Sequence, residues 1–211
     1  RPPRSTLFPY TTLFRSGLPV LLGNPTAAEE AAKSIELLDW LNERLDAITG
    51  VHARMDRLGL VGHSRGGKVA WLVLSADPSR AQAIAGVDPV DDTGGPRGNQ
   101  PRVVQGPFEF NPPTLVIGAG LGGACAPVGD NHEQFYAAAA APAWHVIAEN
   151  CGHADMLDED AARQAASFCT GGSNRALMRR LIAGLMTAFF RGSLQADPAA
   201  YDCIDPARAP D

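Results

Sequence analysis

The sequence contains few charged residues and no region dominated by one sign of charge. Charged side chains account for 19% of the 211 residues, and the formal net charge is −5. A nucleic-acid-binding face requires clustered lysine and arginine, and a solvated acidic tail requires a run of carboxylates. Because neither pattern is present, we expect a globular protein without a nucleic-acid partner.

The sequence also lacks a hydrophobic run long enough to cross a bilayer. The longest apolar stretch near the C-terminus, Leu177 to Phe190, is interrupted by Arg179 and Arg180. A membrane-spanning helix needs about 20 predominantly apolar residues, so we predict no transmembrane segment. Hydrophobic residues nevertheless make up 45% of the chain, which is enough for one globular domain with a substantial core.

Cysteine is scarce, and its positions do not form a metal-binding pattern. No two cysteines are spaced as a CxxC pair, and none is grouped with histidine at zinc-site spacing, so we predict no metal site. The pattern is compatible with buried free thiols or with one or two disulfides. Among the possible disulfides we favour Cys169–Cys203, which would tie down the C-terminal tail. The four cysteines are Cys125, Cys151, Cys169 and Cys203.

The first sixteen residues differ in composition from the rest of the chain. They contain no acidic residue and show no amphipathic period, and the sequence begins at Arg1 rather than at methionine. The stretch is rich in arginine, serine and threonine, as transit peptides are. It also resembles translated foreign sequence, and we favour this second interpretation. We therefore expect residues 1–16 to be a non-native or disordered leader and residues 17–211 to form the domain.

Short apolar runs alternate with amphipathic segments from residue 26 onward. Short apolar runs bounded by glycine, proline or aspartate are typical of strands that are buried on both faces of a parallel sheet. The alternation predicts an α/β fold with a mostly parallel sheet and flanking helices. At the first helix, Thr26 and Glu29 form a capping-box pattern. The predicted strands are 57–61, 83–87, 114–117 and 144–148, and the predicted helices are 26–48, 66 to 74 or 76, 132–140 and 176–190.

The strongest functional motif is Gly62-His63-Ser64-Arg65-Gly66, which follows a predicted strand and precedes a predicted helix. In a GxSxG motif the serine lies on a sharp strand-to-helix turn, and the glycines have no Cβ to collide with neighbouring segments. The N-terminus of the helix places partial positive charge beneath the serine. We therefore predict that Ser64 is a nucleophile.

A serine hydroxyl is a weak nucleophile unless a base takes its proton. In hydrolases with this motif the order along the chain is serine, acid, histidine. His153 lies just after the strand predicted at 144–148, in the sequence CGHADM, and is the predicted base. The alternative is a structural histidine with a hydrogen bond to Asp155. The histidines that fit less well by position are His52, His63, His132 and His145.

The acid does not occupy its most common position in such hydrolases. That position follows the strand at 114–117, where bacterial polyester hydrolases carry an aspartate, but glycines occupy it in this sequence. Asp88 instead follows directly after the strand at 83–87 and so lies at the same sheet edge as Ser64. We predict that Asp88 is the acid, although an Asp-Pro turn is its alternative role. The other candidate acids are Asp91, Asp92 and Asp130.

These motifs together resemble the chlorophyllase family. The resemblance rests on GHSRGGK around Ser64, GVDPVD around Asp88, TLVIGAGLG followed by CAPVGDNHEQFY, and CGHADMLDED around His153. It extends over about residues 58–190, and its more specific features are the arginine after the serine and the acid on the earlier strand. Carried over by position, the resemblance implies an α/β-hydrolase fold with a Ser64–Asp88–His153 triad.

The resemblance implies hydrolysis of chlorophyll to chlorophyllide and phytol, with a small hydrophobic ester as the partner and no metal or organic cofactor. The backbone N–H of Arg65 would be the first oxyanion donor, whereas the second comes from a loop that would precede Thr26. Because family members have further strands and helices in that part, we expect an N-terminally truncated fragment with weak activity. The alternatives are an esterase of the polyester or lipid type and a catalytically inert hydrolase-fold module used for binding.

Overall fold

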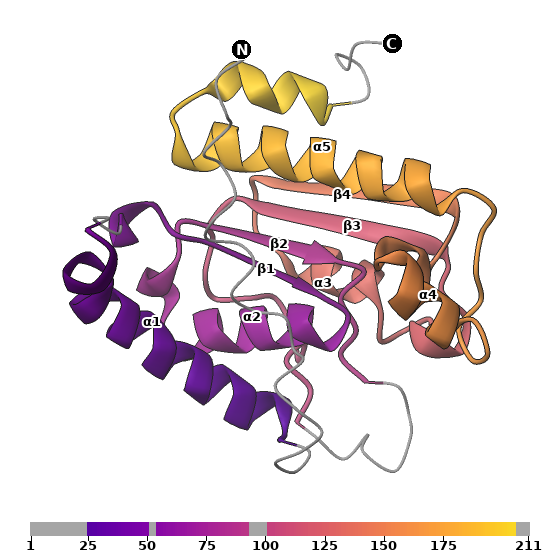
Figure 1. Ribbon diagram of the computed structural model, residues 1–211, viewed down its shortest axis with the longest axis horizontal. Coiled ribbons are helices and arrows are strands. Elements are labelled where there is room, and N and C mark those ends of the chain that lie inside the picture. The colour runs from indigo at the N-terminus through magenta and orange to yellow at the C-terminus, as the bar shows by residue number, and fades with distance from the viewer. Residues whose placement is uncertain (1–24, 51–53, 93–100, 206–211) are drawn as a thin grey trace.

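The computed structural model describes residues 25–50, 54–92 and 101–205, which form an α/β domain around a parallel sheet (Figure 1). The leader predicted at 1–16 lies outside the described residues. All neighbouring strands of the sheet are parallel, so the predicted fold class is confirmed. In sheet order the strands are β1 (Gly59–His63), β2 (Ala83–Val87), β3 (Thr114–Leu121) and β4 (Ala143–Gly152).

Strands β3 and β4 are longer than the sequence indicated. The predicted strands ended at Ile117 and Ala148, because glycines follow in one strand and polar residues in the other. The two strands nevertheless pair as far as Leu121 and Gly152, with an irregularity after Ala119. Pairing satisfies the backbone N–H and C=O groups, so these residues belong to the sheet despite their low strand propensity.

Helices cover both faces of the sheet, with α1 and α2 on one face and α5 on the other (Figure 1). The first helix begins with the predicted capping box, in which Thr26 and Glu29 each accept the other's backbone N–H. No helix within the described ranges is long and apolar enough to span a membrane. The α-helices are α1 (Ala27–Thr49), α2 (Arg65–Ala76), α3 (His132–Ala138), α4 (Glu159–Ala165) and α5 (Arg175–Leu194).

Each face of the sheet has its own hydrophobic core, because successive side chains of a strand point to opposite faces. Burial of a large apolar side chain contributes roughly 1.5–3 kcal/mol, so the two helical layers hold the sheet between them. The core on the α2 face contains the buried side chains Trp71, Leu74, Ile84, Val116 and Phe135. The core on the α5 face contains Leu115, Ile117, Met178 and Phe189.

A sharp turn at Ser64 connects β1 to α2, which begins at the next residue. Ser64 has φ 55° and ψ −127°, a region that residues with a Cβ rarely adopt. The turn brings Gly62 against the start of α2, where a Cβ on Gly62 would lie 2.0 Å from the carbonyl oxygen of Gly66. A Cβ on Gly66 would meet no atom within 4 Å. The steric need for glycine therefore exists at Gly62, whereas the same expectation for Gly66 is wrong.

A disulfide joins Cys125 to Cys169, with 5.4 Å between the two Cα atoms. The predicted Cys169–Cys203 bridge is wrong, because Cys203 has an exposed free thiol at the end of the 3₁₀-helix Pro198–Cys203, which packs against α5. Cys169 is buried beside Ala154, and Cys125 packs against the same cluster. The bridge therefore joins the loop after β3 to the segment that follows α4.

Substitution of Gly62 by alanine is expected to destabilise the fold, because the added methyl group would overlap the backbone of Gly66. Overpacking of this kind typically costs ~1–3 kcal/mol. Gly66→Ala is the matched control, since it adds a methyl group in open space and replaces a poor helix former with a good one. Thermal unfolding should show a clear loss of Tm for Gly62→Ala and an unchanged or higher Tm for Gly66→Ala. Equal Tm values for the two variants would contradict the steric argument.

Replacement of both Cys125 and Cys169 by alanine is expected to lower the free energy of unfolding by about 4 kcal/mol. The bridge spans 44 residues of sequence, and a loop of that length strongly restricts the unfolded chain. Urea denaturation measures the loss, and Cys203→Ala, which removes an exposed free thiol, should leave stability nearly unchanged. In the denatured, unreduced protein only Cys151 and Cys203 should react with a thiol reagent. Reaction of all four cysteines would disprove the bridge.

Candidate active site

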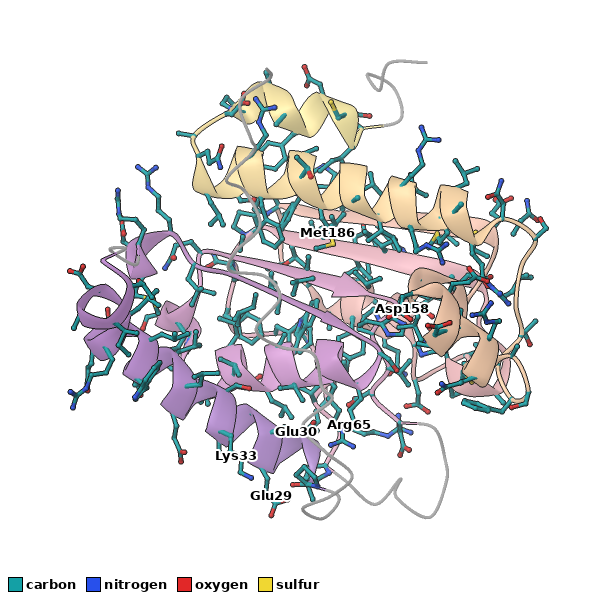
Figure 2. The ribbon with its side chains drawn as sticks, viewed as in Figure 1. Glu29, Glu30, Lys33, Arg65, Asp158 and Met186 are labelled. Carbon is teal, nitrogen blue, oxygen red and sulfur yellow. A yellow bond between two sulfur atoms is a disulfide. The ribbon has the colours of Figure 1, made fainter. Side chains whose placement is uncertain are left out.

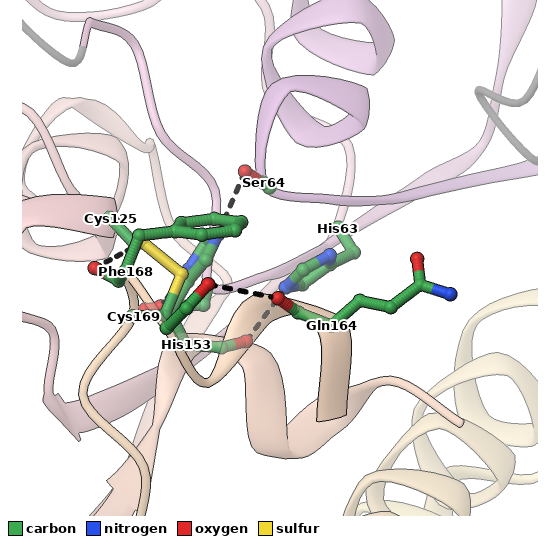
Figure 3. The surroundings of a disulfide bond; sticks show 9 residues. His63, Ser64, Cys125, His153, Gln164, Phe168 and Cys169 are labelled. Carbon is green, nitrogen blue, oxygen red and sulfur yellow. Dashed lines mark hydrogen bonds and ion pairs between the residues drawn. A yellow bond between two sulfur atoms is a disulfide. The ribbon is translucent and has the colours of Figure 1, made fainter. Parts of the chain in front are cut away.

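Ser64, Asp88 and His153 follow directly after the ends of β1, β2 and β4. Because the carboxyl ends of parallel strands meet at one edge of a sheet, these residues lie together although 89 positions separate Ser64 from His153. The His153 Nε2 atom lies 2.9 Å from Ser64 Oγ (Figure 3), and His153 Nδ1 lies 2.6 Å from Asp88 Oδ2. The structure thus brings together the residues predicted as nucleophile, acid and base.

The hydrogen-bond partners of Asp88 determine which nitrogen of His153 carries the proton. Asp88 is completely buried, and its Oδ1 accepts the backbone N–H of Ala119 at 3.0 Å. An ionised carboxylate can only accept hydrogen bonds, so Nδ1 of His153 must donate to it. The Nε2 atom is then the basic nitrogen and accepts the hydroxyl proton of Ser64. This arrangement can transfer a proton from Ser64 to His153.

Asp155 holds the turn that carries His153. Its carboxylate accepts the backbone N–H groups of Gly152 at 2.7 Å and Gly172 at 2.5 Å, and Nε–H of Arg175 at 3.0 Å. Burial by itself would raise the pKa of Asp155, but these donors and the positive charge outweigh it, and the pKa is lowered. The alternative pairing of Asp155 with His153 is therefore not formed, because Asp155 faces these donors and the ring of His153 faces other partners.

His63, the last residue of β1, supports the turn that carries His153. The two ring centroids are 4.6 Å apart, and His63 Nε2 lies 3.0 Å from the backbone carbonyl oxygen of His153. Burial and the neighbouring His153 lower the pKa of His63 to about 4, so a neutral imidazole donates its Nε2–H to this carbonyl. The contact joins residues 90 positions apart, and no local sequence signal could have found it.

The alternative acids have other partners or positions. Asp91 is buried and pairs with the equally buried Lys68 of α2 at 3.0 Å, and its carboxylate also accepts both backbone N–H groups of residues 103–104. Asp130 pairs with an arginine of the loop before β3, and Asp92 is partly exposed one residue after Asp91. The ion pair of Lys68 and Asp91 connects α2, the helix after Ser64, to the loop after β2.

The backbone N–H of Arg65 lies beside Ser64, whereas its side chain contacts the start of α1. It is the first residue of α2, so its backbone N–H has no acceptor within the helix, and the helix N-terminus carries partial positive charge. The side chain lies toward the start of α1 (Figure 2), where the guanidinium pairs with Glu30 at 2.8 Å and donates to the Pro25 carbonyl at 2.6 Å. The backbone N–H beside Ser64 is therefore the candidate oxyanion donor.

Two of the remaining histidines form a pair beside Asp88. His132 is the first residue of α3, and its Nδ1 lies 2.8 Å from Nε2 of His145 in β4. The Nε2 atom of His132 lies 4.0 Å from Asp88 Oδ1. Both histidines lie in or near predicted regular elements and were therefore not predicted as the base. His52 lies outside the described residues. Within those ranges, no group of three or more histidine, cysteine, aspartate or glutamate side chains is arranged to hold a metal ion.

Comparison with known proteins identifies the relatives of this chain. The family model described as Chlorophyllase matches residues 18–210. Chlorophyllase-2 of Arabidopsis thaliana is 33% identical over 199 residues, which cover 83% of this chain and 63% of the relative. Chlorophyllase-1 of Arabidopsis thaliana is 34% identical over 211 residues, covering 88% and 65%. Chlorophyllase-1, chloroplastic, of Citrus unshiu is 34% identical over 204 residues, covering 88% and 61%.

The chain therefore spans less than two thirds of the length of these relatives. The family model nevertheless covers almost all of the chain itself. It matches the same stretch that carries the serine motif and the sequences around Asp88 and His153. The resemblance predicted from these motifs is confirmed, and the chain belongs to the chlorophyllase family.

Proposed function

We propose that this protein is a serine ester hydrolase of the chlorophyllase type, with Ser64 as nucleophile, His153 as base and Asp88 as acid. The observation that carries the proposal is the continuous chain of contacts from the Ser64 hydroxyl through His153 to the buried Asp88, with separations of 2.9 and 2.6 Å. A neutral imidazole whose Nδ1–H is held by a carboxylate is the arrangement that activates a serine. Membership of the family supports an ester as the substrate.

The proposed reaction is acyl transfer in two steps. His153 removes the proton of the Ser64 hydroxyl as its oxygen attacks the ester carbonyl, and Asp88 stabilises the resulting imidazolium. The backbone N–H of Arg65 stabilises the negative charge that develops on the carbonyl oxygen. His153 then donates the proton to the leaving alcohol. Water then attacks the acyl-enzyme, with His153 removing its proton, and the acid product leaves as Ser64 regains its proton from His153.

The surroundings of the site favour a hydrophobic ester. The two most exposed large hydrophobic side chains of the described residues are Val128, at 86%, and Phe168, at 67%. Each lies within three positions of a disulfide cysteine, and Figure 3 places Phe168, Ser64 and His153 together in the surroundings of that disulfide. An exposed apolar side chain such as Phe168 near a reactive group is typical of a surface that binds an apolar ligand.

Chlorophyll is the leading candidate for the substrate. The relatives named in the comparison are chlorophyllases, and the resemblance implies cleavage of the phytyl ester to give chlorophyllide and phytol. The phytyl group is a long apolar alcohol, and its contact with Phe168 would remove apolar surface of both from water. The exposed side chains near the disulfide therefore match the chemistry of this ester better than that of a short polar one.

Replacement of Ser64 by alanine is expected to abolish labelling by a fluorophosphonate probe. Ester turnover should fall by roughly 10⁴-fold or more, and Asp88→Asn should cause a loss of roughly 10⁴-fold because His153 loses its tautomer. Ser167→Ala, which alters an exposed serine beside Phe168, is the control and should be labelled like the unchanged protein. Persistent labelling of Ser64→Ala would show that another residue is the nucleophile.

The substrate itself is tested by turnover of chlorophyll against p-nitrophenyl acetate and butyrate by the unchanged protein. Release of chlorophyllide supports the chlorophyllase assignment. Activity confined to the short esters would reject chlorophyll and favour another type of esterase. Absence of both labelling and turnover would favour the inert binding module.

Substitution of Phe168 by alanine is expected to weaken the binding of long apolar esters. Loss of an apolar contact worth about 1–2 kcal/mol corresponds to a rise in KM of roughly 5- to 30-fold, measured with p-nitrophenyl palmitate. KM for p-nitrophenyl acetate should change little, because the acetyl group is too short to use that surface. Ile48→Ala is the control, since Ile48 has a similar exposure of 64% but lies at the end of α1. An equal change for both esters would argue against a binding role for Phe168.

A further inference from the structure

A pair of imidazoles lies beside Asp88 and has no part in the reaction proposed above. His132 is 97% removed from solvent, with 3% of its surface exposed, and His145 is partly buried. Their ring nitrogens are 2.8 Å apart, and the other nitrogen of His132 lies 4.0 Å from Asp88 Oδ1. Polar groups in the interior are costly unless they have partners. Nδ1 of His132 has His145 as its partner, so the atom to be explained is Nε2, which faces Asp88.

The surrounding elements leave room for this pair. A Cβ on Gly118 of β3 would lie only 2.4 Å from Nδ1 of His132, so any larger residue there would displace the ring. Tyr136, one turn further along α3, stacks on His145 with 4.7 Å between ring centroids. The position of the two imidazoles relative to Asp88 is therefore fixed by packing on both sides.

The carboxylate of Asp88 determines the protonation of the pair. If His132 donated from Nδ1 to His145, its Nε2 lone pair would face the negatively charged Oδ1 of Asp88. The favourable assignment places a proton on Nε2 of His132, facing Asp88, and lets Nδ1 accept Nε2–H of His145. His145 thus holds the tautomer of His132, as Asp88 holds that of His153.

The groups around His145 favour the neutral form of its imidazole. Burial and the neighbouring His132 lower the pKa of His145, and Glu133 opposes this only in part. The other groups that face the pair are Asp88 after β2 and the phenol ring of Tyr136. In the tautomer assigned above, His132 presents its Nε2–H to Asp88.

We propose that His132, with its tautomer held by His145, is a positioning residue for Asp88. Its Nε2–H faces Oδ1 and, together with the N–H of Ala119, leaves Oδ2 directed at His153. The N–H dipole also offsets part of the carboxylate's charge and so limits how strongly Asp88 stabilises the imidazolium of His153. The inference rests on the proposed function, in which Asp88 is the acid.

The first test compares His132→Asn with His132→Gln. The amide of glutamine reaches the position of Nε2 and keeps an N–H toward Asp88, whereas asparagine reaches only the position of Nδ1. In His132→Asn more of the carboxylate's charge stabilises imidazolium, so the acid limb of the fluorophosphonate labelling rate should move to higher pH by on the order of one unit. On the acid side of the pH profile, His132→Asn should therefore be labelled about tenfold more slowly than the unchanged protein. His132→Gln should keep the pH profile of the unchanged protein.

A second pair of variants at the partly exposed His145 keeps the test decisive if a buried substitution impairs folding. His145→Gln retains a donor near Nε2, whereas His145→Leu removes it. We expect His145→Leu to shift the pH profile in the same direction as His132→Asn, and His145→Gln to leave it in place. An unshifted profile in both His132→Asn and His145→Leu would overturn the proposal, as would an equal shift in His132→Asn and His132→Gln.

A spectroscopic measurement separates failure of this inference from failure of the proposed function. The Nδ1–H of His153, bonded to Asp88, should give a low-field proton resonance that can be recorded in Ser64→Ala, where no labelling is needed. Adding His132→Asn should move this resonance, and adding His132→Gln should not. If Ser64→Ala is still labelled, the proposed function fails while the resonance still tests His132. If labelling is lost but neither resonance nor pH profile responds to His132→Asn, only the present inference fails.

Discussion

The arrangement of the site depends on one carboxylate that has no access to water. Asp88 is fully buried, and an isolated charge in that position would cost several kcal/mol. Donors surround the carboxylate instead: the N–H of Ala119, Nδ1–H of His153 and, at a longer distance, His132. These donors come from β3, from the turn after β4 and from α3. The arrangement of three segments at the sheet edge is thus tied to the needs of one side chain.

The same edge contains two strained turns, and the sheet holds both. Ser64 and Asp88 directly follow the neighbouring strands β1 and β2 and have φ angles of 55° and 43°. The N–H of Ser64 donates to the Val87 carbonyl at 3.1 Å, and the N–H of Asp88 donates to the Ile117 carbonyl at 2.6 Å, so each turn is bonded to the next strand. Positive φ angles in residues other than glycine persist only where such surroundings determine them. The strain therefore indicates that these side chains must point away from the sheet at fixed positions.

Much of this edge could be predicted from the sequence, because its main components are local. The GxSxG motif specifies its own turn. Asp88 directly follows one apolar run and His153 lies a few residues after another, and the carboxyl ends of such runs must meet in a parallel sheet. What could not be predicted depends on contacts between distant segments. The partner of Cys169 follows from the packing of two loops, and the pairing of His132 with His145 follows from the register of a helix against a strand. Hydrophobic periodicity places such residues in elements but carries no information about which polar side chains meet.

His153, the proposed base, and the exposed side chain of Phe168 depend on the same packing. A Cβ on Gly152 would lie 1.8 Å from the carbonyl oxygen of Thr170, and Asp155 accepts hydrogen bonds on both sides of this contact, from Gly152 and from Gly172. The segment that follows α4 therefore braces the turn of His153, and the disulfide attaches that segment to the loop after β3. Phe168 belongs to the same segment. Under the proposed function, one braced unit would hold the proton acceptor and present the apolar side chain, so a change in its packing would act on proton transfer and on the binding of an apolar ester together.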